Sequence, residues 1–479
     1  MSRAFLLFAV ITGAFAQSKS AVESPQRLVR LNVFATNAKG DPITDLRAAD
    51  IQVREDGQLH PAVFFHFAGV KTAITPPAEG QAVNRPAQAP TVILLDRWND
   101  RSMVAAAAWL DVGAAIGRSE SAERTFIYLL TNHGDVVPIH PLPPADADLR
   151  TLPEPTPAQL RAKLDDAVRK LNGLRDVDVL DPVLKANTTF KALLGLGGQM
   201  SMLPGRKNLI WVTHGFPLTI PIPGADFLDF TPQIRTLTGA ASQSQIVLYT
   251  VEESAQGAGA DPGSLNRETL QMFSSLTGGR WYPSDNTAPA LAGAIGDGRA
   301  SYRLAYYAPV RQKDKKEHKI RLQSTRKDVR LLTDDGYFGE PAQPDPDAAE
   351  RALFTNECHS PFEATEIGLR AKLSPGSEGK SHVDVRIEPG DVLLEQRDGK
   401  YHGELALLFA TYDQGIFKDA PPPTPIEINL SQDQFDKAQT DGINLSLDVQ
   451  PASGVEKIRL IVLDRRLYAL GSITFSAPN

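Results

Sequence analysis

The sequence predicts an α/β protein with a parallel sheet, helices on both faces of it, and β-sandwich segments before and after it. Between residues 91 and 300, five short apolar runs each precede a helix-like or turn-rich stretch, an alternation typical of parallel sheets. Outside this segment, apolar and polar side chains alternate with period two, as in antiparallel strands. The first run ends on Asp96, where such sheets bind their ligands. The runs are 91–96, 125–132, 208–215, 245–252 and 279–283.

The N-terminus has the pattern of a secretory signal peptide. Arg3 is followed by an apolar run and then by the small residues Ala14 and Ala16, which give a basic start, a short apolar stretch and a cleavage site. We expect residues 1–16 to be removed and the mature protein, beginning at Gln17, to be secreted or periplasmic. No later run is apolar enough for a transmembrane segment.

The composition limits which partners and which covalent cross-links we expect for this protein. Acidic residues outnumber basic ones by 57 to 50, and the formal net charge is −7, so nucleic acid is not an expected partner. Cys358 is the single cysteine, so no internal disulfide can form. The stability of the fold must therefore come from apolar cores.

A chain of 479 residues is expected to form two or three domains. Residues 17–73 read as an N-terminal β unit, and a stretch rich in Pro, Ala and Gly at 74–90 reads as a linker. Neither 17–73 nor 301–340 has enough strands for two faces, so we expect them to share one sandwich with the α/β domain, 91–300, inserted between them. Short strands and turns predict a C-terminal β-sandwich over 350–479.

Helix signals divide the central segment. Thr156 and Gln159 form a capping box with Pro157 at the first helical position, and Gly173 ends the apolar periodicity that follows. An edge strand is expected at 135–141. The remaining helices are expected at 102–117, 189–202, 232–244, 265–277 and 288–299, with a short one at 433–438 in the C-terminal segment.

Several separated motifs resemble a known family. The strand order, the aspartate that ends the first strand and the edge strand after the second resemble the von Willebrand factor type A (VWA) domain, which has a Rossmann-like sheet. The segments KGDPITDLRAADIQVREDG, PTVILLDRWND, LPGRKNLIWVTHGFP and LTGGRWYPSDN resemble, more specifically, the secreted bacterial VWFA-related domain proteins of the Acidobacteria type. The resemblance covers roughly residues 28–338.

The resemblance implies a metal site, which this sequence preserves only in part. The family's first loop reads D-x-S-x-S and supplies oxygen ligands to Mg²⁺. Here Trp98 replaces the first serine and cannot ligate a metal, whereas Asp100 replaces the second and can. His214 stands where the family has an aspartate. The implied ligands are Asp96, Asp100 and one of Thr188 or Thr189, and the implied ligand crevice contains Trp98, Asn99 and His214.

Two interpretations of these carboxylates stay open. A degenerate site with so few oxygens predicts weak binding of Mg²⁺ or Mn²⁺, or no cofactor at all. Alternatively, Asp96 and Asp100 cap the following helix and accept hydrogen bonds from its backbone N–H groups.

The function that we expect is recognition without catalysis. The signal peptide and the resemblance imply an exported adhesion module that binds a protein or a cell-surface polymer through the loops beyond the parallel strands. One alternative is an exported hydrolase in which Asp96 and Asp100 act as acid and base. Another is a structural envelope scaffold in which the C-terminal sandwich binds and the α/β domain is a spacer.

Overall fold

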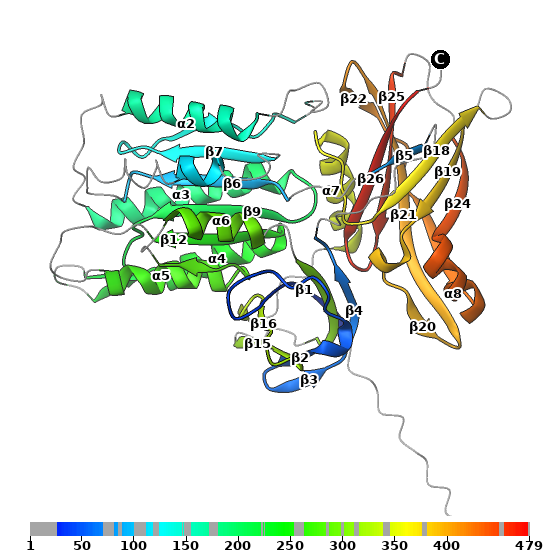
Figure 1. The fold of residues 1–479 in the computed structure, drawn as a ribbon, viewed down its shortest axis with the longest axis horizontal. Coiled ribbons are helices and arrows are strands. Elements are labelled where there is room, and N and C mark those ends of the chain that lie inside the picture. The colour runs from blue at the N-terminus through cyan, green and yellow to red at the C-terminus, as the bar shows by residue number, and fades with distance from the viewer. Residues whose placement is uncertain are drawn as a thin grey trace, which may run out of the picture.

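The computed structural model of the chain describes three units (Figure 1). The described residues are 26–69, 81–84, 89–99, 112–117, 124–145, 147, 155–171, 181–221, 224, 226–252, 263–283, 287–297, 301–310, 316–338, 345–375, 381–449 and 455–477. The expected signal peptide, Asp100 and most of the helix expected at 102–117 lie outside them. Among the described helices, none combines the length and the apolar character needed to cross a membrane.

The first unit is a sandwich made from the two ends of the first 340 residues. Its sheets have the orders β16-β1-β14-β4 and β17-β15-β2-β3. β1 runs antiparallel to β14, with Leu31 opposite Leu304, and β2 pairs with β15. The strands are β1 (Gln26–Thr36), β2 (Ile51–Glu55), β3 (Gln58–His60), β4 (Ala62–Phe67), β14 (Tyr302–Pro309), β15 (Glu317–Ser324), β16 (Arg330–Leu332) and β17 (Gly336–Phe338), with a 3₁₀ turn at Ala48–Asp50.

Local chemistry explains the tightest turn of this unit. Asp56 and Gly57 join β2 to β3 with φ angles of 50° and 84°, the left-handed conformation that two-residue hairpins need. The alternation in β1 places Val29, Leu31 and Val33 in the core between the two sheets, as period two requires.

The second unit is a six-stranded mixed sheet with the order β13-β12-β9-β6-β7-β8. β6 lies at its centre, parallel to β7 and β9, whereas β8 runs antiparallel to β7. A two-stranded hairpin, β10–β11, follows β9. The strands are β6 (Thr91–Asp96), β7 (Thr125–Leu130), β8 (Val136–His140), β9 (Lys207–Thr213), β10 (Thr219–Pro221), β11 (Phe227–Asp229), β12 (Ile246–Glu252) and β13 (Trp281–Tyr282).

The helices of this unit divide between two apolar clusters. One cluster joins the sheet to three helices, and the other joins it to the described helical residues 112–117 and two more helices. Helix ends follow the sequence signals: Thr156 and Gln159 exchange hydrogen bonds as a capping box, and Asp181 caps the next helix. The first cluster contains α3 (Pro182–Ser201), α4 (Thr231–Gln243) and α5 (Gly263–Ser275), and the second contains α2 (Pro157–Leu171) and α6 (Thr287–Asp297).

The third unit contains two antiparallel sheets, β24-β19-β18-β5 and β20-β21-β25-β26, with β22 and β23 also paired to β21. A shared apolar cluster fills the space between them. Cys358, on a helix that packs against the second sheet, is buried. The elements are β5 (Gln81–Val83), α7 (Pro346–His359), β18 (Leu369–Pro375), β19 (Ser381–Ile387), β20 (Glu395–Arg397), β21 (Lys400–Asp413), β22 (Ile416–Asp419), β23 (Thr424–Leu430), α8 (Gln432–Asp441), β24 (Ile443–Val449), β25 (Lys457–Asp464) and β26 (Ala469–Ser476), with a 3₁₀ turn at Pro389–Asp391.

The fold class of the whole chain corrects the sequence prediction. Strands make up 44% of the structure and helices 28%, and the described sheet that has parallel pairs is mixed because of β8. The prediction of an α/β chain built on a Rossmann-like parallel sheet with helices on both faces is therefore wrong, since the protein is mostly β. A VWA domain with a degenerate metal site, which the resemblance implied, gains no support from this architecture. The β-sandwich segments that the sequence predicted before and after 91–300 contribute most of the strands, so the α/β class does not describe the chain.

A second correction concerns the expected linker, 74–90. Its residues 81–83 form β5, which adds an edge strand to the third unit by pairing with β18. Asn84 follows β5 and is 2% exposed. Its amide donates to the carbonyls of Ala364 and Ile367 at 3.1 and 2.8 Å and accepts from the N–H of Leu369 at 2.7 Å. The segment 81–84, which lies between the first unit and the second in the sequence, is therefore bound to the third unit by β5 and by the Asn84 side chain.

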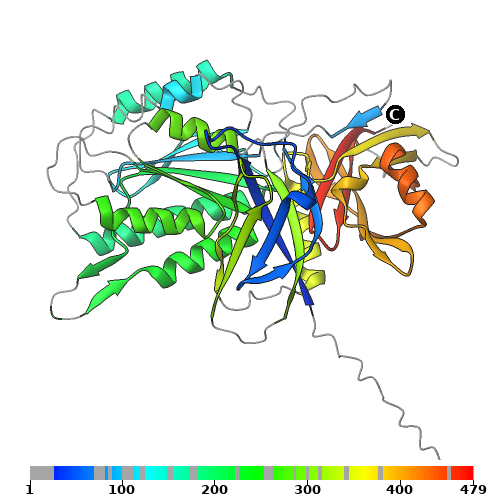
Figure 2. The ribbon, with the colours of Figure 1, turned by 60° about the horizontal axis from the view of Figure 1, so that its bottom comes forward.

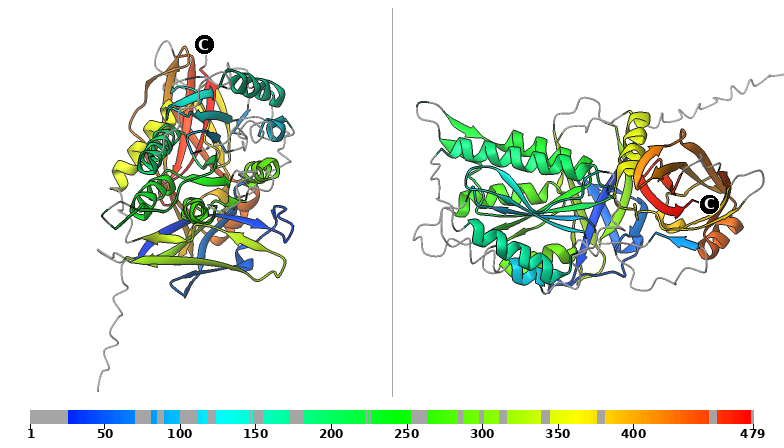
Figure 3. Two further views of the ribbon diagram at one scale, coloured as in Figure 1. Left: turned by 90° about the vertical axis from the view of Figure 1, so that its left-hand side faces the viewer. Right: turned by 90° about the horizontal axis from the view of Figure 1, so that it is seen from above.

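The three units pack against one another through apolar side chains. Figures 1 and 3 show the N-terminal sandwich between the other two units. Phe64 and Ala305 of that sandwich belong to the apolar cluster of the third unit. Phe34 packs edge-on against Tyr249 of the second unit, with ring centroids 6.5 Å apart. The arrangement of the three units is thus set by packing.

Substitution of Asn84 tests whether its hydrogen bonds to the third unit stabilise the protein. Asn84→Ala leaves two carbonyls and one N–H without their partner, so we expect the free energy of unfolding to fall by about 1–3 kcal/mol or more. Urea unfolding of the full chain measures it. Asn429→Ala, at an exposed position of β23, is the matched control and should change the stability by less than about 0.5 kcal/mol. Equal stabilities of the two variants would contradict the role of Asn84.

Candidate functional site

Asp96 stands at the carboxyl end of β6, the central strand of the mixed sheet, and is 1% exposed. Its Oδ1 accepts hydrogen bonds from the backbone N–H groups of Trp98 and Asn99 at 2.9 and 3.1 Å. Its Oδ2 accepts from Asn99 Nδ2 at 2.6 Å, Trp211 Nε1 at 3.0 Å and Thr213 Oγ1 at 2.7 Å. Five donors therefore surround a single buried carboxylate.

The side chains of the loop after Asp96 contact α3. Trp98 is 6% exposed and Asn99 is 8% exposed. Trp98 Nε1 donates to the carbonyl of Lys185 at 3.1 Å, and Asn99 Nδ2 donates to Thr189 Oγ1 at 2.9 Å. The two residues that the sequence placed in an open crevice are thus buried between β6 and the first turns of α3.

The other predicted site residues lie in different surroundings. Thr189 is fully buried, and its hydroxyl donates to the carbonyl of Lys185 at 2.9 Å. Thr188 is partly exposed and packs close to Gly134. His214 follows β9 and accepts a hydrogen bond on its carbonyl from Asn266 at 2.9 Å. Of the predicted set, the structure brings together Asp96, Trp98, Asn99 and Thr189.

Sequence reasoning missed Trp211 and Thr213. Leu95 of β6 is opposite Val212 of β9 in the parallel register, so Thr213 comes beside Asp96. Because side chains alternate along a strand, Trp211 and Thr213 point to the same face of the sheet. The pattern W-x-T at the end of one strand and D at the end of its neighbour was the available signal, but it can be used only when the register is known.

The described donors around Asp96 do not fit a divalent cation. Mg²⁺ and Mn²⁺ need oxygen lone pairs directed at the metal. Here N–H and O–H groups direct hydrogens at both carboxylate oxygens, and the two backbone donors, Trp98 and Asn99, lie in the loop after β6. The capping of the following helix stays a prediction, because its expected start lies outside the described residues. The geometry supports a structural role for Asp96, which orients the loop after β6 and ties β6 to β9 and α3.

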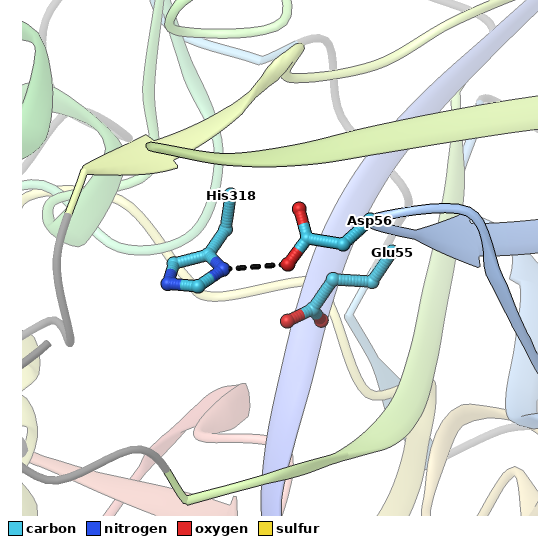
Figure 4. A group of neighbouring side chains, drawn as sticks. All are labelled: Glu55, Asp56 and His318. Carbon is cyan, nitrogen blue, oxygen red and sulfur yellow. Dashed lines mark hydrogen bonds and ion pairs between the residues drawn. The ribbon is translucent and has the colours of Figure 1, made fainter. Parts of the chain in front are cut away.

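A second group of titratable side chains lies in the N-terminal sandwich (Figure 4). Glu55, Asp56 and His318 have ligand atoms within 4.8 Å of one another. Glu55 accepts hydrogen bonds from Tyr337 at 2.6 Å and Tyr306 at 2.8 Å, and His318 Nδ1 lies 2.7 Å from Asp56 Oδ2. Burial, and then the Glu55 carboxylate, raises the pKa of the Tyr306 hydroxyl. These contacts brace β2 against β14, β15 and β17.

Comparisons with known proteins place the chain in no family. No protein-family model matches it, and no curated protein matches it. Among solved structures, the human COPII-coat protein Sec24c aligns with 57% of this chain and 47% of its own length, at 11% identity and a TM-score of 0.26. The chain thus spans about half of that structure. A likeness at this TM-score carries no argument about the fold or the function.

Removal of the Asp96 carboxylate separates a structural role from a metal-binding one. Asp96→Ala leaves three side-chain donors and two backbone N–H groups buried without their acceptor, so we expect a loss of roughly 3 kcal/mol or more in unfolding free energy. Calorimetric Mn²⁺ titrations of the wild type and the variant should both be flat. A saturable wild-type isotherm that disappears in Asp96→Ala would contradict the structural role.

Proposed function

We propose that this chain is a recognition protein without catalytic activity, which binds a protein or a cell-surface polymer at the loop edge of its mixed sheet. We define this edge by the carboxyl end of β6, the β10–β11 hairpin and the first turn of α3. The contacts of Trp98 with Lys185 support the placement of the α3 start beside the end of β6. β10 follows β9 after a short loop, so the hairpin belongs to the same edge.

The exposure of Phe227 is the observation that carries this proposal. Phe227, at the start of β11, is 69% exposed, and Leu184 in the first turn of α3 is 47% exposed. Burial of a phenylalanine side chain against a partner contributes about 1.5–3 kcal/mol. The hairpin lies at the outer margin of the molecule, away from the two β units (Figure 2), where a large partner can reach it.

The geometry of Asp96 favours recognition over hydrolysis. A general acid or base must come within hydrogen-bond reach of its substrate. Asp96 is 1% exposed, and both of its oxygens accept hydrogen bonds from the chain itself. These contacts support a role in which Asp96 holds the loop edge in shape.

A pair of matched substitutions tests the binding edge. Wild-type protein is titrated onto an immobilised cell-envelope fraction of the producing organism, and bound protein is measured by biolayer interferometry. Phe227→Ser should weaken saturable binding by about tenfold or more, the loss expected from 1.4 kcal/mol or more of apolar contact. Ile416→Ser, at a residue that is 59% exposed on β22 of the third unit, is the control and should bind like the wild type.

Two results would contradict the proposal. One is loss of binding in Ile416→Ser with unchanged binding in Phe227→Ser, which would place the contact on the third unit. The other is turnover by the wild type in a panel of hydrolase substrates, which would show that the protein is an enzyme.

A further inference from the structure

The β10–β11 hairpin has one face in the core of the mixed-sheet unit and one face in solvent. Ile220 is 3% exposed, and with Leu228 it packs into the apolar cluster that the sheet shares with α3, α4 and α5. Phe227 lies on the opposite face, because side chains alternate along a strand, and is 69% exposed. Its cross-strand partner, Pro221, is exposed as well. The hairpin is thus anchored on one side and presents an aromatic side chain on the other.

The outer edge of β11 has backbone groups that β10 does not use. The N–H of Phe230 donates to the carbonyl of Leu218 at 3.0 Å, so these two residues are a hydrogen-bonded pair of the hairpin. Such pairs alternate with non-hydrogen-bonded ones in an antiparallel ladder, which directs the N–H and C=O of Phe227 and Asp229 away from β10. Within the described part of the chain, β11 pairs with β10 and with no other strand. This edge therefore offers two donors and two acceptors to an added strand.

Two carboxylates flank the exposed phenylalanine. Asp226 directly precedes β11 and Asp229 ends it, and both are exposed. The N–H of Thr231 donates to Asp229 Oδ1 at 2.8 Å. Hydrogen bonds from the hydroxyl and the N–H of Thr231, and then the charge of Arg235, lower the pKa of Asp229, so this carboxylate is ionised at neutral pH. The edge of β11 thus combines Phe227 with negative charge.

An open strand edge binds an extended peptide through main-chain hydrogen bonds, and alternate side chains give the specificity. Opposite charges on neighbouring strands stabilise their pairing, so Asp226 and Asp229 favour a strand that carries lysine or arginine. We propose that β11 binds an extended, basic segment of a partner protein as an added strand. This inference rests on the proposed recognition function and names a protein as the ligand.

The same edge is less suited to a polysaccharide. A polysaccharide chain lacks alternating N–H and C=O groups with the spacing of a β-strand, so it cannot use the donors and acceptors of Phe227 and Asp229 together. An anionic polysaccharide would, in addition, meet like charge at Asp226 and Asp229. Both the backbone and the charge of the edge therefore favour a basic polypeptide.

Selection from a library of random linear peptides, against the immobilised full mature chain, tests the proposal. Counter-selection against Phe227→Ser removes peptides that bind elsewhere on the protein. We expect the enriched peptides to contain an excess of lysine and arginine and to alternate these with apolar residues. The strongest peptide is then synthesised and titrated by fluorescence anisotropy. Its affinity should fall as the salt concentration rises, because exposed charges are screened.

A charge-removing variant tests the contribution of the carboxylates. Asp229→Asn keeps an oxygen that can accept from the N–H of Thr231, so the hairpin should fold as in the wild type. Peptide binding should weaken by about twofold to fivefold, the effect of losing one exposed ion pair. Asp419→Asn is the matched control, since Asp419 is exposed at the end of β22 and accepts from the N–H of Ala420 at 2.9 Å. This control should bind the peptide like the wild type.

N-methylation of single residues in the peptide tests the added strand. Each methyl group removes one backbone N–H donor, and only alternate donors of an added antiparallel strand face β11. Methylation at every second position should therefore weaken binding by about threefold or more, through the loss of a hydrogen bond. Methylation at the intervening positions should have a smaller effect.

Any one of three results overturns the proposal. They are a selection that enriches no peptide for the wild type over Phe227→Ser, equal peptide binding by Asp229→Asn and the wild type, and a methylation scan without alternation. Digestion of the immobilised envelope fraction with proteinase K separates this proposal from the recognition function. We expect digestion to abolish binding. Binding that survives digestion but is lost in Phe227→Ser would refute a protein ligand and leave the recognition function standing.

Discussion

The pairing of β1 with β14 is the constraint on which the rest of the structure depends. Leu31 lies opposite Leu304, so the whole mixed-sheet unit must leave the N-terminal sandwich and return to it. The exit and the return are joined directly, because the N–H of Ala68 donates to the carbonyl of Ser301 at 2.7 Å. The entropy of closing a long loop grows only slowly with its length, so a folded insertion of this size is compatible with a stable sandwich.

β14 also links the sandwich to the third unit, because its side chains alternate between two cores. Tyr302, Leu304 and Tyr306 face the core of the N-terminal sandwich, whereas Ala305 belongs to the apolar cluster of the third unit. Arg303, on the same side as Ala305, reaches the carbonyl of Glu366. A single strand whose side chains alternate with period two thus positions the mixed sheet and the third unit.

The sequence predicted local elements well and long-range ones poorly. The capping box at Thr156 and the strand that ends at Asp96 were found because their signals lie within a few residues. The helix α7 was missed, although Asp345 accepts a hydrogen bond from the N–H of Asp347 and a proline occupies its first turn, because the segment 350–479 was interpreted as short strands and turns. The strand β5 is short and pairs only across the chain, so composition made it look like a linker.

The difference between local and long-range signals also explains which residues around Asp96 were missed. The donors to Asp96 come from Trp211 and Thr213, and their positions follow from a register that no local pattern contains. The fold class was wrong because the chain was classed by the segment 91–300, although most of its strands lie outside this segment, in antiparallel sheets.

Hydrogen–deuterium exchange of the full mature chain, followed by mass spectrometry, tests the central role of the β1–β14 pairing most directly. If the pairing holds the insertion and the third unit together, the backbone amides of β1 and β14 exchange through one cooperative opening and with the same free energy. Fast exchange of β1, at the rate of an unstructured peptide, while β14 stays protected would contradict the account.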